Sequence, residues 1–308
     1  MKNNLKNLTI LVNSCDKYDD LWEPFFKLFK KFGGELINCP IVLNTESKQF
    51  SYEGLNITCP NNYKEPVEWG RRLRATLKEI KTDYVLSLLD DFFLQKPANV
   101  SVITQCIDWL KTNPDIGAFN LLSIKDSREA GVDFENFCFI EPTAKYRINS
   151  QACVWKKDVL YNSILDIESP WEWETYGNER NSIILNNTKF YCISELVDEP
   201  YFYNSEFHNK KYSPDTVRNA VIQGKWDLSC IEQCFKDNDI NIDYNIRGIY
   251  KPKIINTKKL SFFKRCVRFL AYRVFSNKHR KSKQNLAKKR YLLIEKPIKE
   301  FDTLSHKQ

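Results

Sequence analysis

The amino-acid sequence predicts an α/β fold built on a mostly parallel β-sheet with helices on both faces. One observation is an alternation, over roughly 120 residues, of apolar β-branched runs with segments whose apolar residues recur at helical spacing. Another is that the β-like runs are nearly continuous in apolar residues, as is typical of strands buried on both faces. Finally, 308 residues with 42% hydrophobic content are enough to bury a large core.

The expected elements follow one another in a regular order. The strand candidates are apolar runs: 8–15, 40–46 and 83–91, which end in polar residues, and 55–59 and 116–122. The helix candidates each carry one apolar face: 19–32, where Asp19 or Asp20 would cap the helix, 67–80 and 102–110. Beyond them we expect a loop over 123–145, a strand and a short helix over 147–165, a strand at 188–194, and irregular structure from 200 to 250.

The cysteines and the N-terminus favour a cytoplasmic protein. Ten cysteines are scattered mostly through apolar runs, without a Cys-x-x-Cys pair, as expected of reduced thiols in a reducing compartment. The N-terminal segment lacks the long apolar stretch of a signal peptide. No segment approaches the ~20 apolar residues of a membrane span.

The net charge of +8 is unevenly distributed along the chain. Residues 251–308 contain 18 Lys and Arg against 3 Asp and Glu, whereas residues 1–250 contain 29 against 36. We therefore expect two parts, a globular domain over 1–250 and a basic helical extension over 251–308.

The extension contains an amphipathic segment at 258–290. One helical stripe is apolar and the opposite face is basic: Phe263, Val267, Leu270 and Val274 against Lys264, Arg265 and Arg268. Such a helix can lie on an anionic membrane surface, or it can pack on the globular domain with its cations in water. A nucleic-acid backbone is a third partner for these cations, although the acidic balance of 1–250 disfavours it.

Within TDYVLSLLDDFFLQKP, residues 82–97, an apolar stretch has the pattern of a buried strand. This stretch ends on two adjacent carboxylates, Asp90 and Asp91. Carboxylate oxygens are the ligands that Mg²⁺ and Mn²⁺ prefer, and these ions often share them with substrate phosphates. The alternative is a simple turn, because Asp also hydrogen-bonds its own backbone there. In a parallel sheet, ligands bind where the carboxyl ends of the strands meet.

The sequence resembles bacterial GT-A-type, family 2-like glycosyltransferases, which take sugars from nucleotide-diphosphate donors to build capsule, lipopolysaccharide or other surface glycans. Five blocks carry the resemblance, in the expected order: TILVNSCDKYDDLWEPFFKLF, PIVLNTE, WGRRLRATLKEIKTDYVLSLLDDFFL, QACVWKKDVL and ESPWEWE. Together they extend over about residues 7–250. The resemblance implies a GT-A-like catalytic domain that binds its donor at the strand ends.

The resemblance also implies roles for individual residues in donor binding. Ser14 and Asp16, after the first strand, and Glu46, after the second, would lie near the base and ribose. Arg72 or Arg74 would approach the diphosphate, an anion that guanidinium groups bind well.

A divalent cation, Mn²⁺ or Mg²⁺, is the implied cofactor. Asp90 and Asp91 stand where the family has an Asp-x-Asp metal motif, shortened to an adjacent pair. We expect Asp91 to be the direct metal ligand. His208 is a further candidate for the metal or a phosphate.

Transfer of a sugar to a hydroxyl needs a group that takes the proton of the acceptor. Glu172 and Glu174 are the candidates, because in similar inverting enzymes an acidic residue at a helix start in this part of the chain acts as the base. Ser169-Pro170-Trp171-Glu172 also has the pattern of a capping box, which offers Glu172 a structural role. A solvated surface position is the alternative for Glu174.

We therefore expect a metal-assisted, inverting hexosyl- or N-acetylhexosaminyl-transferase that acts on a glycan or lipid-linked acceptor, in the cytoplasm or at the inner face of the cell membrane. Two other classes stay open, a nucleic-acid-binding protein that uses the basic tail and a non-catalytic nucleotide-sugar-binding module. Kinase and dehydrogenase activities are disfavoured because the sequence contains no Walker loop and no Gly-x-Gly-x-x-Gly motif.

Overall fold

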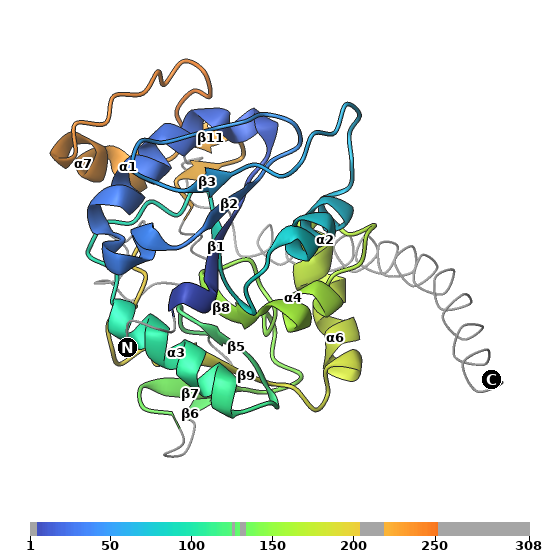
Figure 1. The fold of residues 1–308 in the computed structure, drawn as a ribbon. Helices are drawn as coiled ribbons and strands as arrows, with labels where there is room; N and C mark the ends of the chain where they lie inside the picture. The colour runs from blue at the N-terminus through green and yellow to red at the C-terminus, as the bar shows by residue number, and fades with distance from the viewer. Residues whose placement is uncertain (1–4, 125–126, 130–133, 204–218, 252–308) are drawn as a thin grey trace, which may run out of the picture. The chain divides into compact units, whose positions relative to one another are not determined.

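The computed structural model describes residues 5–124, 127–129, 134–203 and 219–251. All of them belong to the first unit of the chain, Met1–Lys251, and the structure described is that of this unit (Figure 1). The predicted helix over 258–290 and the predicted ligand His208 lie outside the described residues.

The predicted α/β fold, with a large sheet flanked by helices, is confirmed (Figure 1). Nine strands pair in the order β3-β2-β1-β4-β8-β5-β9-β7-β6. Their bounds are β1 Leu8–Asn13, β2 Ile41–Asn44, β3 Ile57–Thr58, β4 Tyr84–Leu89, β5 Ile116–Asn120, β6 Ser127–Glu129, β7 Phe137–Ile140, β8 Cys153–Lys156 and β9 Lys189–Ile193. Only β8 and β7 run against the other seven described strands of this sheet, so the sheet is mostly parallel as predicted.

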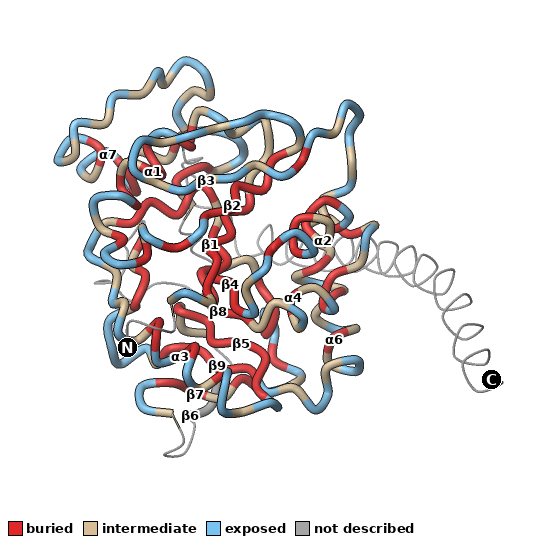
Figure 2. Tube along the Cα trace, in the orientation of Figure 1, coloured by how far each residue is buried: buried red, intermediate tan, exposed pale blue. Residues whose placement is uncertain are grey.

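Two apolar cores lie on opposite faces of the sheet, because successive side chains of a strand point to opposite sides. In β1, Ile10 and Val12 join one core and Leu11 joins the other. The first core packs against α1 (Trp22–Phe32), α3 (Val100–Thr112) and α7 (Leu228–Asp237). The second packs against α2 (Trp69–Glu79) and α4 (Lys157–Ser163). Figure 2 shows β1 and β2 buried along their length between these layers.

Shorter helical segments complete the described unit. The 3₁₀ turns are η1 (Leu5–Asn7), η2 (Asp16–Leu21) and η3 (Gly34–Asn38), and the segment after α4 consists of α5 (Pro170–Glu172), the π-helical turn η4 (Trp173–Gly177) and α6 (Asn178–Ile184). Among the described residues, no helix combines the length and apolar character needed to cross a membrane. The nine cysteines in this part of the chain are all free thiols, as their scattered pattern predicts.

The first helix begins differently from the prediction. Because η2 precedes α1, the residue before α1 is Leu21, which provides no side-chain cap, and the predicted capping by Asp19 or Asp20 is wrong. Asp19 instead forms an ion pair with Lys48, and Asp20 forms one with Arg247. Tertiary partners that are distant in sequence therefore engage both carboxylates.

The structure adds regular elements where the sequence predicts irregular chain. Strands β6 and β7 lie in the predicted loop over 123–145, and the hairpin of β10 (Val221–Ile222) and β11 (Lys225–Trp226) precedes α7. The hairpin turn consists of Gln223 and Gly224, with φ of 52° and 76°, which suits a two-residue turn between antiparallel strands. These elements are short or pair with distant segments, so local periodicity does not reveal them.

Candidate functional site

The carboxyl ends of β1, β2 and β4 meet at one edge of the sheet. The last residues of these strands, Asn13, Asn44 and Leu89, are in register across the three strands. The residues that follow them lie together at this edge and include five of those predicted for the site: Ser14, Asp16, Glu46, Asp90 and Asp91. We call this set of positions the strand-end edge.

Buried amide side chains hold the strand-end edge together. Asn13 donates to Ser87 Oγ (3.2 Å) and accepts from Asn44 Nδ2 (3.0 Å). Asn44 Oδ1 in turn accepts from Asn61 Nδ2 and from Thr76 Oγ1, each at 3.0 Å. All five residues are buried. Since buried polar groups that are fully paired rigidify their surroundings, this network fixes the relative positions of the three strand ends and α2.

Asp90 is tied to the end of β1 and to the first helix. Its backbone N–H donates to Asn13 O (3.3 Å), and its Oδ2 accepts a hydrogen bond from Ser14 Oγ. Ser14 Oγ also accepts from Trp22 Nε1 at 2.7 Å. Ser14 and Asp90, both predicted separately for the site, are therefore in direct contact, and the indole of Trp22 orients the Ser14 hydroxyl.

The carboxylates of Asp90 and Asp91 are both buried, each residue being 6% exposed. Burial raises the pKa of Asp91 to about 7, although its backbone N–H and Arg247 act in the opposite direction. Burial, followed by the charge of Asp91, raises the pKa of Asp90 well above its usual range, and the hydrogen bond from Ser14 only partly offsets this. Two negative charges are thus unfavourable in this environment, and a bound cation would offset that cost.

The Asp90–Asp91 pair fits a hard divalent cation that is shared with a phosphate ligand. The pair offers carboxylate oxygens, and Mg²⁺ and Mn²⁺ commonly take one or two carboxylates and complete their coordination with water and substrate phosphates. Within the described ranges, no group of three His, Cys, Asp or Glu side chains is placed to hold a metal ion. His208 falls in the undescribed range 204–218, and its role stays a prediction.

The raised pKa of Asp91 gives a first testable prediction. In the presence of a chelator, the free energy of unfolding of Asp91→Asn should be compared with that of the wild type between about pH 4 and pH 8. The unfolded chain loses the Asp91 proton near pH 4, whereas the folded protein keeps it up to about pH 7. Wild-type stability should therefore fall relative to the variant as the pH rises, by on the order of 2–4 kcal/mol, since one pKa unit is about 1.4 kcal/mol. Parallel pH profiles for the two proteins would contradict the burial of this carboxylate.

Arg72 on α2 joins the ends of β1 and β2. Its Nη1 donates to the carbonyl oxygens of Ser14 (2.9 Å) and Asn44 (2.6 Å), and its Nη2 lies 3.1 Å from Oε1 of Glu46. The side chain of Arg72 is only 4% exposed. The structure thus places Arg72 at the strand-end edge, where it holds the edge together, and its predicted contact with the diphosphate stays a prediction.

Asp16 fixes the loop after β1 to the loop after β2. Its carboxylate accepts hydrogen bonds from the hydroxyl of Ser47 (2.6 Å) and from the backbone N–H groups of Glu46 (3.0 Å) and Lys48 (3.2 Å), while its own N–H donates to the Glu46 carboxylate. Burial would raise the pKa of Asp16, but the hydrogen bonds from Ser47 and the backbone lower it below the usual value. Asp16 therefore stays ionised and orders the loops where the nucleoside is predicted to bind.

Arg74, the alternative residue for the diphosphate, contacts a different part of the protein. Its Nη1 lies 3.2 Å from Oδ1 of Asp166, and its guanidinium stacks 4.4 Å from the ring centroid of Tyr161 on α4. The structure therefore brings Arg72 to the strand-end edge and Arg74 to α4.

Glu172 forms the capping box predicted from the sequence. Its carboxylate accepts from Ser169 N (3.0 Å) and Ser169 Oγ (2.9 Å), and its own N–H donates to Ser169 Oγ at 3.3 Å. The structural role of Glu172 is thus confirmed, while its role as a base stays a prediction.

Glu174 is connected with the strand-end edge through the segment before β8. Its Oε1 accepts from the N–H of Ser150 at 2.7 Å. Strand β8 is antiparallel to β4, with Cys153 opposite Ser87, so the residues before β8 lie where β4 ends. The solvated position weighed for Glu174 is wrong, because the side chain is half-buried and anchors this segment.

An aromatic contact extends this connection toward Asp91. Gln151 Oε1 accepts from the hydroxyl of Tyr203, and the Tyr203 ring stacks on Phe92 with ring centroids 4.1 Å apart. Phe92 directly follows Asp91 in the chain.

Sequence reasoning missed Arg247, which lies near the Asp90–Asp91 pair. Its positive charge lowers the pKa of both aspartates, after the larger effect of burial has raised them. Asp20, the carboxylate that holds Arg247, is separated from it by 227 positions in sequence. No short-range pattern marks this arginine, so tertiary structure alone reveals it.

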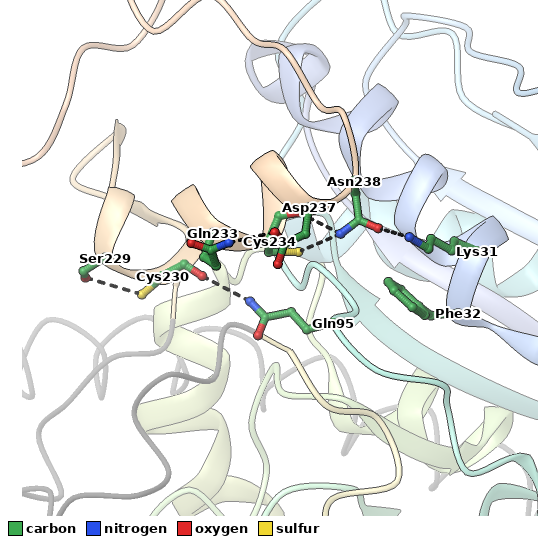
Figure 3. Close-up of a pocket in the computed structure, with 9 residues that line it drawn as sticks. All are labelled: Lys31, Phe32, Gln95, Ser229, Cys230, Gln233, Cys234, Asp237 and Asn238. Atoms are coloured by element: carbon green, nitrogen blue, oxygen red, sulfur yellow. Dashed lines mark hydrogen bonds between the residues drawn. The ribbon is translucent and has the colours of Figure 1, made fainter.

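A separate pocket of about 270 Å³ lies between α1 and α7 (Figure 3). Its polar side chains are largely bonded to the protein itself: Lys31 Nζ donates to Asn238 Oδ1 (2.5 Å), and Gln95 Nε2 donates to the carbonyl oxygen of Cys230 (3.1 Å). It contains none of the residues predicted for the site. This pocket is therefore distinct from the strand-end edge.

No family model matches the sequence, and no curated protein matches it significantly. Solved structures do match. The chain is similar to part of TarS from S. aureus, at 12% identity and a TM-score of 0.41, covering 61% of this chain and 35% of that one.

Two further solved structures show a likeness of the same order. The mannosyltransferase PcManGT from Pyrobaculum calidifontis, in complex with GDP-Man and Mn²⁺, matches at 12% identity and a TM-score of 0.36, over 51% of this chain and 46% of that one. A cytidylyltransferase from Leptospira borgpetersenii matches at 13% identity and a TM-score of 0.37, over 67% and 79%. The matched region is thus less than half of the length of TarS and of the mannosyltransferase.

Proposed function

We propose that the protein is a glycosyltransferase that moves a sugar from a nucleotide-diphosphate donor to an acceptor hydroxyl with the help of a divalent cation. The observation that carries this proposal is the buried Asp90–Asp91 pair at the carboxyl ends of parallel strands, in direct contact with Ser14. A carboxylate pair in this position suits a cation that in turn binds a diphosphate. The family resemblance of the sequence supports the same activity.

Each part of the strand-end edge has a role in this proposal. The loops joined by Asp16 and Glu46 bind the nucleoside, and Arg72 keeps them in place. Asp90 and Asp91 hold the cation, with Asp91 as the direct ligand and Asp90 oriented by Ser14. When bound, the cation would neutralise negative charge that develops on the departing diphosphate.

Glu174 is the base favoured by the geometry. It lies on η4 next to the segment before β8, at the edge where the donor would bind, and Glu172 is engaged in its capping box. In this role a Glu174 oxygen takes the proton of the acceptor hydroxyl while that hydroxyl oxygen bonds to the sugar and the bond between the sugar and the diphosphate breaks. Attack from the face opposite the departing diphosphate inverts the configuration of the sugar. The acceptor we propose is a glycan or a lipid-linked sugar of a surface polysaccharide, and the sugar is a hexosyl or N-acetylhexosaminyl group.

The basic extension has a proposed role in reaching that acceptor. We propose residues 1–250 as the catalytic domain and 251–308 as an extension whose segment 258–290 attracts an anionic membrane surface by its charge. This would bring the enzyme to a lipid-linked acceptor at the inner face of the membrane.

A ligand screen tests the proposed function. The full chain should be heated with a panel of nucleotide sugars, with and without Mn²⁺, because a ligand that binds the folded state raises the unfolding temperature. We expect at least one nucleotide sugar to stabilise the protein by several degrees, and by more when Mn²⁺ is present. Asp91→Asn should lose the increment due to Mn²⁺ while keeping the effect of the nucleoside alone.

Two outcomes of the screen would contradict the proposal. Failure of every nucleotide sugar to stabilise the wild type would remove the donor site. Equal Mn²⁺ effects in the wild type and in Asp91→Asn would remove the metal assignment. Nucleic-acid affinity that falls steeply with salt and survives loss of Asp90 and Asp91 would instead favour the nucleic-acid-binding class.

A further inference from the structure

Arg247 lies in a segment whose backbone is held on the hairpin before α7. Trp226 N donates to Gly248 O (3.0 Å), and Tyr250 N donates to Trp226 O (2.8 Å). Gly248 also donates to Tyr244 O (2.7 Å) with a φ of +71°, a conformation that favours glycine. The backbone around Arg247 is therefore well defined, and the side chain projects from a fixed base.

The guanidinium of Arg247 is held against η2 by an ion pair and an aromatic ring. Its Nε donates to Oδ2 of Asp20 at 2.6 Å, and its Nη2 donates to Oδ1 of the same carboxylate and to Lys17 O (3.0 Å). The guanidinium lies 4.2 Å from the ring centroid of Tyr18. A two-point contact with a carboxylate fixes both the position and the plane of the group. Only 7% of the side chain is exposed.

These contacts do not use the Nη1 group of Arg247. No described residue accepts a hydrogen bond from its Nη1, while Nε and Nη2 are both engaged. The guanidinium is bonded to η2, which begins two residues after Ser14, and the Ser14 hydroxyl donates to Asp90. In agreement with this position, the charge of Arg247 acts on both carboxylates. By contrast, Arg72 is bonded to the strand ends and Arg74 to Asp166.

We propose that Arg247 is a donor-binding residue whose Nη1 donates to a phosphate of the nucleotide donor beside Asp90 and Asp91. The inference rests on the proposed function and assigns the diphosphate contact to an arginine other than the two singled out in the sequence. Asp20 and Tyr18 hold the guanidinium in place before the ligand arrives, so little side-chain freedom is lost on binding. Because Asp20 already balances one positive charge, the site gains a directional donor with little added net charge.

The test separates a phosphate contact from a structural role by comparing ligands that differ only in the diphosphate. Binding of the four common nucleosides and their 5′-diphosphates to the full chain should be measured with Mn²⁺ present, for the wild type, Arg247→Met and Arg247→Lys. In Arg247→Met the diphosphate should bind roughly tenfold or more weakly, as expected for loss of a charge-assisted hydrogen bond, while the nucleoside binds within about twofold of the wild type. Arg247→Lys should fall between the two, because it keeps the charge but loses the fork.

Lys189→Met is the control. Lys189 also forms an ion pair, at 2.9 Å from Asp115, but at the opposite edge of the sheet, and its loss should change neither affinity.

Equal losses for nucleoside and diphosphate in the Arg247 variants would show that the arginine only holds η2, and unchanged diphosphate affinity would also overturn the inference. If Arg247→Met does not fold, Arg247→Lys and Asp20→Asn carry the same comparison. A wild type that binds no diphosphate would overturn the proposed function. If the wild type binds the diphosphate and the Arg247 variants bind it equally well, only this inference is overturned.

Discussion

Asp91→Asn is expected to lower the rate of sugar transfer by about 100-fold or more. The substitution keeps the shape of the side chain but removes the negative charge that would hold the cation beside the diphosphate. It also removes the buried charge whose pKa is raised to about 7, so the folded protein should be at least as stable as the wild type at neutral pH. The rate is measured as release of nucleoside diphosphate from the nucleotide sugar that stabilises the protein most, at saturating Mn²⁺.

Asp115→Asn is the matched control for this experiment. It makes the same chemical change in an aspartate that pairs with Lys189 at the start of β5 and β9, on the edge of the sheet opposite the strand ends. We expect its rate of transfer to stay within about twofold of the wild type, since exposed ion pairs contribute little. Full activity in Asp91→Asn would refute the metal assignment. Melting curves of both variants exclude unfolding as the cause of any loss.

Gly70→Ala is expected to give a large loss of stability. A Cβ at position 70 would lie 2.0 Å from the backbone oxygen of Leu165 and 3.2 Å from that of Glu168, so α2 and the 165–168 segment would have to separate. The Gly70 N–H donates to Glu168 O at 2.9 Å, and this bond would be lost as well. The 165–168 segment is itself braced, because the buried Glu168 carboxylate accepts from Leu165 N (2.7 Å) and pairs with Arg180.

The expected cost of Gly70→Ala is about 3 kcal/mol in the free energy of unfolding, measured by urea denaturation. The gain in helix propensity from alanine, about 1 kcal/mol, is smaller than this. Because α2 carries Arg72, a displaced helix should also weaken nucleoside binding. Gly224→Ala serves as the control: nothing lies within 4 Å of its Cβ, and the substitution costs only the strain of a φ of +76°, about 1 kcal/mol. A larger loss in Gly224→Ala than in Gly70→Ala would contradict the close packing of α2.

The parallel part of the sheet and one end of the candidate site were predictable from sequence. Strands β1, β2 and β4 are continuous apolar runs, and each ends where polar residues begin. The capping box of Ser169 and Glu172 was predictable for a similar reason, since its partners are three residues apart. Features whose sequence signal lies within one strand or one helical turn could thus be predicted.

Features that depend on partners distant in the chain could not be predicted from the sequence. The sequence offers three arginines in WGRRLRATLKEI, but only packing decides that Arg72 faces the strand ends and Arg74 faces Tyr161 and Asp166. Glu174 is bonded to Ser150, which lies in a segment positioned by the antiparallel pairing of β8 with β4. Strand β7 pairs with β6 and with β9, and the short length of β6 and β7 gives no clear periodicity.

The sequence by itself determined that parallel strands end in carboxylates at one edge of an α/β sheet, because side-chain periodicity and strand termination are local properties of the chain. Tertiary structure alone decided which basic group stands beside those carboxylates. Arg247 reaches them across more than 150 intervening residues through a hairpin, a helix and one ion pair with Asp20. Contacts of that kind follow from the packing of whole elements, and no short stretch of sequence contains both partners.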